Sequence, residues 1–141
     1  MKRHFSTFLF LLCTLFITAQ EEEDAIRKTL QNYIDGSSYN NPELIQSAFY
    51  EEADLFLSKK DQELWILSPE EYGKLFENRK KGEFNGRIGN ILMIDFENNI
   101  ACAKAEILIP SRDLKFIDIF LLKKIGDTWK IISKAATAIS D

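Results

Sequence analysis

The most constraining feature of the sequence is a pair of apolar runs near its C-terminal end, at residues 116–122 and 129–133. Both runs are rich in isoleucine, leucine and aromatic residues, which favour β-strands. Between them lies Gly126-Asp127, a turn signal that is typical of hairpins. The two runs therefore predict an antiparallel hairpin, and we expect the rest of the chain to be organised around it.

The first run is apolar on both faces, apart from one acid. Successive strand residues point to opposite faces, so one face carries Phe116, Asp118, Phe120 and Leu122, and the other carries Ile117, Ile119 and Leu121. Such a strand is covered on both sides. We expect the protein's own helices on one side and a partner subunit on the other. An acid in this setting needs an ion pair or hydrogen bonds, so any chemistry is expected near Asp118.

The N-terminal residues have the pattern of a secretory signal peptide. Residues 1–4 are basic, residues 8–17 are apolar, and a small residue, Ala19, follows. We expect cleavage after Ala19 and export to a periplasm or the outside of the cell, which leaves residues 20–141 as a single domain. About ten apolar residues are too few to span a bilayer, which takes about 20, so we expect no stable membrane insertion after cleavage.

Cleavage would also narrow the available chemistry. The only histidine, His4, would leave, and Cys102 would be the one remaining cysteine. A chain without histidine cannot form a histidine-based metal site or a Ser-His nucleophile, so we expect no metal and no cofactor. Cys102 is predicted to be a small core residue. Removing Lys2 and Arg3 leaves 16 basic against 22 acidic residues, a net charge of −6, which argues against nucleic-acid binding.

Three segments before the hairpin have helical patterns. The first contains Ile26, Leu30 and Tyr33 at helical spacing, with the acidic run 21–24 at its start and Gly36 as its stop. The second follows the cap Asn41-Pro42 and ends at Tyr50. The third begins with a capping box, Ser68-Pro69-Glu70-Glu71, and runs to about Asn78.

The remaining segments predict strands and one loop. Strands are expected at residues 55–58, 64–67, 87–96 and 100–109, with Asn98-Asn99 as a hairpin turn. The polar stretch 79–86 predicts a mobile loop. The fold class is therefore α+β, with three N-terminal helices packed on one face of a curved, mostly antiparallel sheet.

Taken together, these segments resemble a known superfamily. The pattern QNYIDGSSYNNPELIQSAFYEEADL, a capped helix and the ending FIDIFLLKKIGDTWKIISK resemble the nuclear transport factor 2-like superfamily, which has a cystatin-like fold. Within it, the resemblance is to the SnoaL-like, "putative lumazine-binding" group of small exported bacterial proteins, and it covers about residues 24–137. It implies a cone-shaped sheet wrapped around the helices, a cavity between them, and a homodimer formed through the outer sheet face.

The same resemblance bears on catalysis. In ketosteroid isomerase, a relative, a carboxylate base works with a tyrosine and a protonated aspartic acid. Tyr33 falls on the tyrosine position, Asp118 on the protonated-acid position and Leu57 on the base position. Because leucine cannot abstract a proton, we expect that reaction to be absent, leaving a polar pair that can hold a carbonyl or hydroxyl oxygen. The alternative is a structural Asp118, satisfied by Lys104, Lys134, a tyrosine hydroxyl or the backbone.

Three functions stay open. The preferred one is binding of a small apolar or aromatic molecule, without catalysis, by a cavity lined with aromatic residues and one acid. The residues of this predicted site are Tyr33, Tyr50, Phe56, Trp65, Tyr72, Phe76, Asp118 and Phe120. The first alternative is an enzyme of the dehydratase, isomerase or cyclase type, with Asp118 and either Tyr33 or Tyr50 as its catalytic pair. The second is a structural or protein-interaction module whose cone is filled by the same aromatic residues.

Overall fold

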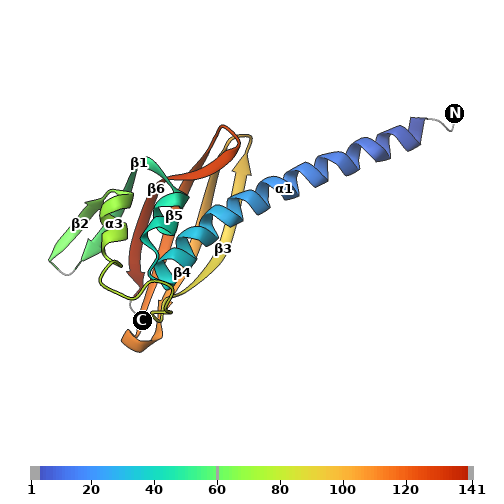
Figure 1. Ribbon diagram of the computed structural model, residues 1–141. Helices are drawn as coiled ribbons and strands as arrows, with labels where there is room; N and C mark the ends of the chain where they lie inside the picture. The colour runs from blue at the N-terminus through green and yellow to red at the C-terminus, as the bar shows by residue number, and fades with distance from the viewer. Residues whose placement is uncertain (1–3, 60, 140–141) are drawn as a thin grey trace.

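The chain folds into one curved sheet with its helices on one face (Figure 1). The computed structural model describes residues 4–59 and 61–139. The elements are α1 (His4–Ser38), α2 (Pro42–Ala48), β1 (Phe49–Lys59), β2 (Gln62–Leu67), α3 (Pro69–Lys74), β3 (Ile88–Glu97), β4 (Ile100–Ile109), the 3-10 helix η1 (Pro110–Arg112), β5 (Leu114–Ile125) and β6 (Thr128–Ile139). Within the described ranges, no helix is long and apolar enough to cross a membrane.

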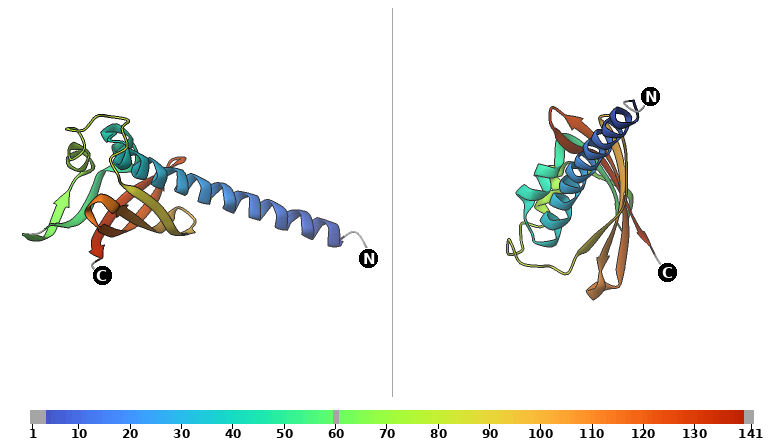
Figure 2. Two further views of the ribbon diagram at one scale, coloured as in Figure 1. Left: turned by 90° about the horizontal axis from the view of Figure 1, so that it is seen from below. Right: turned by 90° about the vertical axis from the view of Figure 1, so that its right-hand side faces the viewer.

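The sheet has six strands in the order β2-β1-β6-β5-β4-β3. All neighbouring strands are antiparallel except β1 and β6, which are parallel. Figure 2 shows the helices lying against the concave face of the sheet, and no other described element lies on the opposite face. This arrangement confirms the predicted α+β fold and its mostly antiparallel sheet.

Helix α1 differs from its prediction at both ends. It begins at His4, so the acidic run 21–24 lies inside it. It also continues through Gly36 to Ser38. Glycine is needed at position 36 because α2 passes close by: a Cβ there would lie 2.7 Å from the backbone nitrogen of Ile45. The helix ends at Ser38. After it, Asn40 adopts a positive φ of 54°, and Asn41 N–H donates to Gly36 O at 2.8 Å.

The next two helices are shorter than predicted. Helix α2 ends at Ala48, because Phe49 is already extended (φ −97°, ψ 155°) and begins β1. Helix α3 begins with the predicted capping box, in which Ser68 Oγ accepts from Glu71 N–H at 3.2 Å and Glu71 Oε2 accepts from Ser68 N–H at 2.8 Å. It ends at Lys74, and turns follow it.

Both predicted hairpins form. Asn98 between β3 and β4, and Gly126 between β5 and β6, have positive φ angles of 54° and 60°. On the inner face, α1 lies close to β3. A Cβ at Gly89 would come within 2.6 Å of the Ile34 side chain, so a residue without a side chain is needed where helix and sheet meet.

The loop 79–86, predicted to be mobile, is held against the end of α1. Gly82 N–H donates to Tyr39 O at 2.7 Å, and Asn85 N–H donates to Ser38 O at 2.9 Å. The Asn85 side chain donates to Ser37 O and to Asn40 Oδ1, both at 2.7 Å. The loop is therefore attached to the helix terminus at Gly82 and Asn85, and its mobility stays a prediction.

A bulge in β6 changes which side chains face the helices. Leu122 of β5 pairs with Ile131, but Leu121 pairs with Ser133, so Ile132 is an extra residue. Trp129 and Ile131 before the bulge are buried, and so is Lys134 after it. With strict alternation Lys134 would instead face away from the helices.

The outer face of the sheet carries apolar side chains that no other described residue covers. On β5, Ile119 and Leu121 are 44% and 51% exposed, whereas Asp118 and Phe120 on the inner face are buried. Cys102 of β4 pairs with Leu121 and lies half-buried on this outer face. Its predicted core position is therefore wrong, because it is the alanines on either side of it that face the helices.

Candidate functional site

A buried polar cluster forms around Asp118, in the middle of β5. Its neighbours across the sheet are Ala105 of β4 and Ala136 of β6, and these small side chains leave room above the carboxylate. Tyr33 from α1 donates its hydroxyl to Asp118 Oδ2 at 2.7 Å. Lys134 Nζ lies 3.2 Å from the same oxygen. Asp118 and Lys134 are each 2% exposed, so they form an ion pair in a nearly dry environment.

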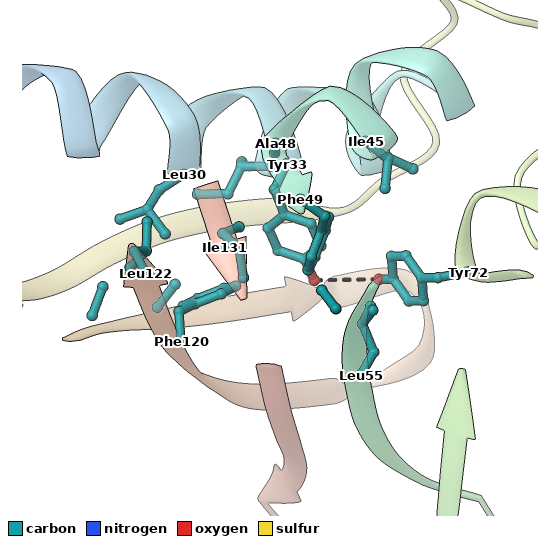
Figure 3. Close-up of a cluster of buried hydrophobic side chains, with 14 of the residues drawn as sticks. Leu30, Tyr33, Ile45, Ala48, Phe49, Leu55, Tyr72, Phe120, Leu122 and Ile131 are labelled. Carbon is teal, nitrogen blue, oxygen red and sulfur yellow. Dashed lines mark hydrogen bonds between the residues drawn. The ribbon is translucent and has the colours of Figure 1, made fainter. Parts of the chain in front are cut away.

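Aromatic rings complete the surroundings of Lys134. Its ammonium lies 5.4 Å from the ring centroid of Tyr33 and 5.5 Å from that of Tyr72, within the range of cation–π attraction. The two tyrosine hydroxyls are 3.2 Å apart, and the dashed line in Figure 3 marks the hydrogen bond between them. Because Tyr33 gives its own proton to Asp118, the Tyr72 hydroxyl is the donor between them. The cluster is thus a chain of hydrogen bonds from Tyr72 to Asp118.

Tyr33 is fixed as a neutral hydrogen-bond donor. Burial raises its pKa well above the ordinary value of 10.0, and the negative charge of Asp118 raises it further. Its ring packs edge-on against Phe49 and Phe120, with centroids 5.8 and 5.4 Å away (Figure 3). The phenol therefore stays protonated at neutral pH and has little freedom to turn.

A pocket of about 200 Å³ opens beside this cluster. Its polar wall contains Asp118, Lys134, Tyr72 and Arg87, and its remaining wall is mostly apolar. The latter consists of Leu57, Ser58, Trp65, Phe116 and Ala136, from β1, β2, β5 and β6. Hence one end of the cone is filled by the protein's own side chains, and the other end is open.

Arg87 is a site residue that the sequence reasoning missed. It precedes β3 and lines this pocket together with Tyr72. Its Nε is buried and has no hydrogen-bond partner among the described residues. Burial by itself would lower the pKa of Arg87, but attraction to Tyr72, Tyr33 and Asp118 outweighs burial and raises it. The one available signal was a cation at the start of an otherwise apolar strand.

The structure brings some of the predicted site residues together. Tyr33, Tyr72 and Asp118 are joined by hydrogen bonds, and Trp65 lines the open pocket. Phe76 packs edge-on against Tyr72 at 5.4 Å and lines a neighbouring pocket instead. Their contact with a ligand stays a prediction.

The other predicted residues lie outside the open pocket. Phe120 is buried against Tyr33 in the core. Tyr50 is partly buried near the start of β1 and packs on the core. Phe56 lies between Leu55, which is buried, and Leu57, which lines the pocket, so its side chain points to the opposite face of the sheet.

The contacts of Asp118 decide what the cluster can do chemically. The carboxylate accepts a hydrogen bond and pairs with an ammonium, so it has the surroundings of an ionised acid rather than of a protonated donor. Tyr33 gives its proton to Asp118 and is not directed at the pocket space. At the isomerase base position, Leu57 is an apolar wall. Among the described residues, no group of three or more histidine, cysteine or acidic side chains could hold a metal ion.

Comparisons with known proteins identify the family and the fold. The model of a family described as "Putative lumazine-binding" matches residues 21–135. A nuclear transport factor 2-like protein of unknown function from Shewanella baltica is 22% identical, with a TM-score of 0.74, covering 86% of this chain and 96% of that one. A similar protein from Silicibacter pomeroyi is 16% identical, with a TM-score of 0.75 and coverages of 86% and 98%.

A third solved structure carries the name of an enzyme. It is described as a putative scytalone dehydratase from Novosphingobium aromaticivorans and is 18% identical, with a TM-score of 0.64 and 89% coverage of both chains. At these identities, the likeness to all three structures establishes the fold alone. No curated protein sequence matches the chain.

Proposed function

The chain belongs to the "Putative lumazine-binding" family of nuclear transport factor 2-like proteins, and we propose that its open pocket binds a small aromatic or apolar molecule without catalysing a reaction. The observation that carries the proposal is the pocket of about 200 Å³ itself. Its apolar wall offers a surface for a ring, and the cations Lys134 and Arg87 beside it can orient a polar substituent.

The size of the pocket limits the ligand. Sites for drug-sized molecules usually have about 300–1,000 Å³, and this pocket is smaller. The ligand is therefore a fragment-sized molecule of one or two rings. Trp65 and Phe116 supply aromatic surface for stacking, which favours a flat ring over a flexible chain.

Binding is favoured over catalysis by how the cluster is occupied. A dehydratase-type reaction would use Asp118 with Tyr33 or Tyr50 as acid and base. Tyr33 and Asp118 are already bonded to each other, and Tyr50 is not among the residues that line the pocket. The filled-cone alternative is supported only at the closed end, where Phe49 and Phe120 pack on Tyr33.

The binding proposal is tested by blocking the pocket. Ala136 lines it, whereas Ala135, the preceding residue of β6, is exposed on the other face. The full chain, Ala136→Leu and the matched control Ala135→Leu would be screened by thermal shift with neutral one- and two-ring compounds such as indole. We expect binding to the wild type and the control and none to Ala136→Leu. Equal shifts for all three proteins, or no shift for any compound, would contradict the proposal.

We propose further that the protein acts as an exported homodimer. Export is supported by the basic-apolar-small pattern of residues 1–19 and would be tested by N-terminal sequencing of the protein from its native cells, expected to start at residue 20. The dimer is supported by the uncovered apolar outer face at Ile119 and Leu121. Sedimentation of the wild type should show a dimer. Leu121→Arg should dissociate it, whereas Leu75→Arg, on the helix-covered side, should not. A monomeric wild type would refute the dimer.

A further inference from the structure

A second pocket, of about 410 Å³, gathers most of the arginines of the chain. The sequence has five arginines, and Arg79, Arg87 and Arg112 line this one pocket. It shares Arg87 and Tyr72 with the first pocket. This concentration of positive charge is notable in a chain whose formal net charge is −4.

None of the three guanidinium groups forms an ion pair among the described residues, although Arg87 also feels the charge of Asp118 from the first pocket. No aspartate or glutamate lines the pocket. The ion pairs among the described residues use other cations, such as Arg27 with Glu23 and Lys134 with Asp118. Three like charges around one space repel one another, and the buried Nε of Arg87 has no hydrogen-bond partner among the described residues. An anion in the pocket would relieve both conditions.

The pocket is held in place before any ligand arrives. The loop that carries Arg79 and leads to Arg87 is bonded to the end of α1, and Asn85 Oδ1 accepts from Arg87 N–H at 3.1 Å. The turn η1, which carries Arg112, lies against this loop: a Cβ at Gly86 would be 3.9 Å from Ser111 Oγ. A loop and a turn that are already ordered lose less conformational entropy on binding than mobile ones.

We propose that this arginine pocket, lined by Arg79, Arg87 and Arg112, is a binding site for the carboxylate or phosphate group of a small molecule. Guanidinium groups bind both oxyanions through paired, parallel hydrogen bonds. Ser111 offers a hydroxyl at the same pocket, and Phe76 and Ile109 offer apolar surface. The best-suited ligand is therefore an acid attached to a small apolar or aromatic body rather than a bare inorganic anion.

The experiment titrates the full chain with four probes by calorimetry. Benzoate and phenyl phosphate carry the two oxyanions on a ring, inorganic phosphate lacks the ring, and benzyl alcohol lacks the charge. We expect benzoate or phenyl phosphate to bind more tightly than inorganic phosphate. Benzyl alcohol should bind more weakly than benzoate and phenyl phosphate. Added salt should weaken the binding of the anions. The preference between benzoate and phenyl phosphate identifies the oxyanion.

Two exposed arginines allow variants that should still fold. Arg79→Gln and Arg112→Gln should each weaken anion binding about tenfold, and Arg112→Lys, which keeps the charge but loses the fork, should weaken it less. Arg27→Gln is the matched control, because Arg27 pairs with Glu23 away from the pocket. Ala136→Leu, which blocks the first pocket, should leave anion binding unchanged, so failure of this site and failure of the proposed function can be told apart.

Three results would overturn the proposal. One is absence of binding for all three anions at low salt. Another is equal affinity for benzoate and benzyl alcohol in Ala136→Leu, whose first pocket is blocked, which would show that charge is not recognised. The third is an equal loss of affinity in Arg27→Gln and Arg112→Gln, which would show that the loss comes from the lower net charge of the protein and not from a specific site.

Discussion

Two positive centres in this protein are treated in opposite ways. Lys134 is 2% exposed and has a carboxylate at 3.2 Å and two tyrosine rings around it. Arg79 and Arg112 are exposed at a pocket wall that contains no acid. A charge removed from water must be neutralised within the fold, whereas a charge that water still reaches can remain available for a ligand.

This difference assigns separate roles to the two regions. The cluster of Tyr33, Tyr72, Asp118 and Lys134 is closed by its own hydrogen bonds and should contribute to stability. The arginine pocket has unused donors and should contribute to binding with little effect on stability. The variants below test whether stability and binding are divided in this way.

The largest effect on stability is expected from Asp118→Asn. It leaves the buried ammonium of Lys134 without its counter-charge, and breaking a buried pair in this way costs about 3–5 kcal/mol. Urea unfolding at pH 7 measures it. The control Glu70→Gln, which breaks the exposed pair with Lys74, should change little.

A double variant distinguishes loss of the ion pair from the cost of leaving one buried charge unpaired. Asp118→Leu combined with Lys134→Met removes both ions, so it should recover much of the stability lost in Asp118→Asn. If Asp118→Asn were no more destabilising than Glu70→Gln, the closed cluster would not be a stabilising unit and the comparison would fail.

The next largest effect is expected from Tyr33→Phe. This change removes the hydrogen bond to the charged Asp118, which contributes about 1.5–3 kcal/mol, and with it the bond that Tyr33 accepts from Tyr72. Tyr72→Phe removes the neutral bond between two hydroxyls, which contributes about 0.5–1.5 kcal/mol. Urea unfolding should give a clearly lower free energy of unfolding for Tyr33→Phe than for Tyr72→Phe. The reverse order would mean that the carboxylate is not the main acceptor in the cluster.

The closed cluster also predicts an alkaline loss of stability. The pKa of Tyr33 is raised above its ordinary value of 10.0, so between these two values the folded chain holds a proton that the unfolded chain has released. The free energy of unfolding is unaffected by Tyr33 below about pH 10 and then falls by about 1.4 kcal/mol per pH unit.

Comparison with Tyr33→Phe isolates the effect of Tyr33 ionisation on the free energy of unfolding, because the other groups that titrate at high pH are present in both proteins. Urea unfolding from pH 9 to 11 should show the difference between wild type and variant shrinking as the pH rises. A constant difference would show that Tyr33 ionises equally easily in the folded and unfolded chains.

The smallest effect on stability is expected at the arginine pocket. Arg79→Gln and Arg112→Gln should change the free energy of unfolding by no more than about 0.5 kcal/mol, with a small gain where like-charge repulsion is relieved. Urea unfolding measures this in the same series. A loss as large as that of Tyr33→Phe would mean that the arginines hold the loop and turn together, and the two regions would no longer differ in role.

The parts of the fold that could be predicted are those specified by neighbouring residues. The capping box at Ser68 and the hairpin turn at Gly126 need only a few adjacent side chains to be recognised. Gly36 was wrongly predicted to end the helix, because the reason for a glycine there is the close approach of α2. Cys102 was misassigned because an apolar strand does not indicate by itself which of its faces the helices cover.

The site was predictable to a similar degree. Asp118 stood out because an acid within an apolar run needs a partner, and Lys134 and a tyrosine hydroxyl were among the partners considered. Arg87 gave little signal, since its importance depends on η1 meeting the loop before β3. Contacts between such distant segments come from the topology of the sheet, not from local pattern.

The bulge at Ile132 has a consequence for how this strand can change over time. Point substitutions in β6 alter one side chain, but loss of a single residue at the bulge would restore regular pairing on both sides of it. Ser133 would still pair with Leu121 and Lys134 with Phe120, so Lys134 would keep facing inward and Asp118 would keep its cation. At this one place the lineage can therefore lose a residue from the strand and still keep the buried ion pair.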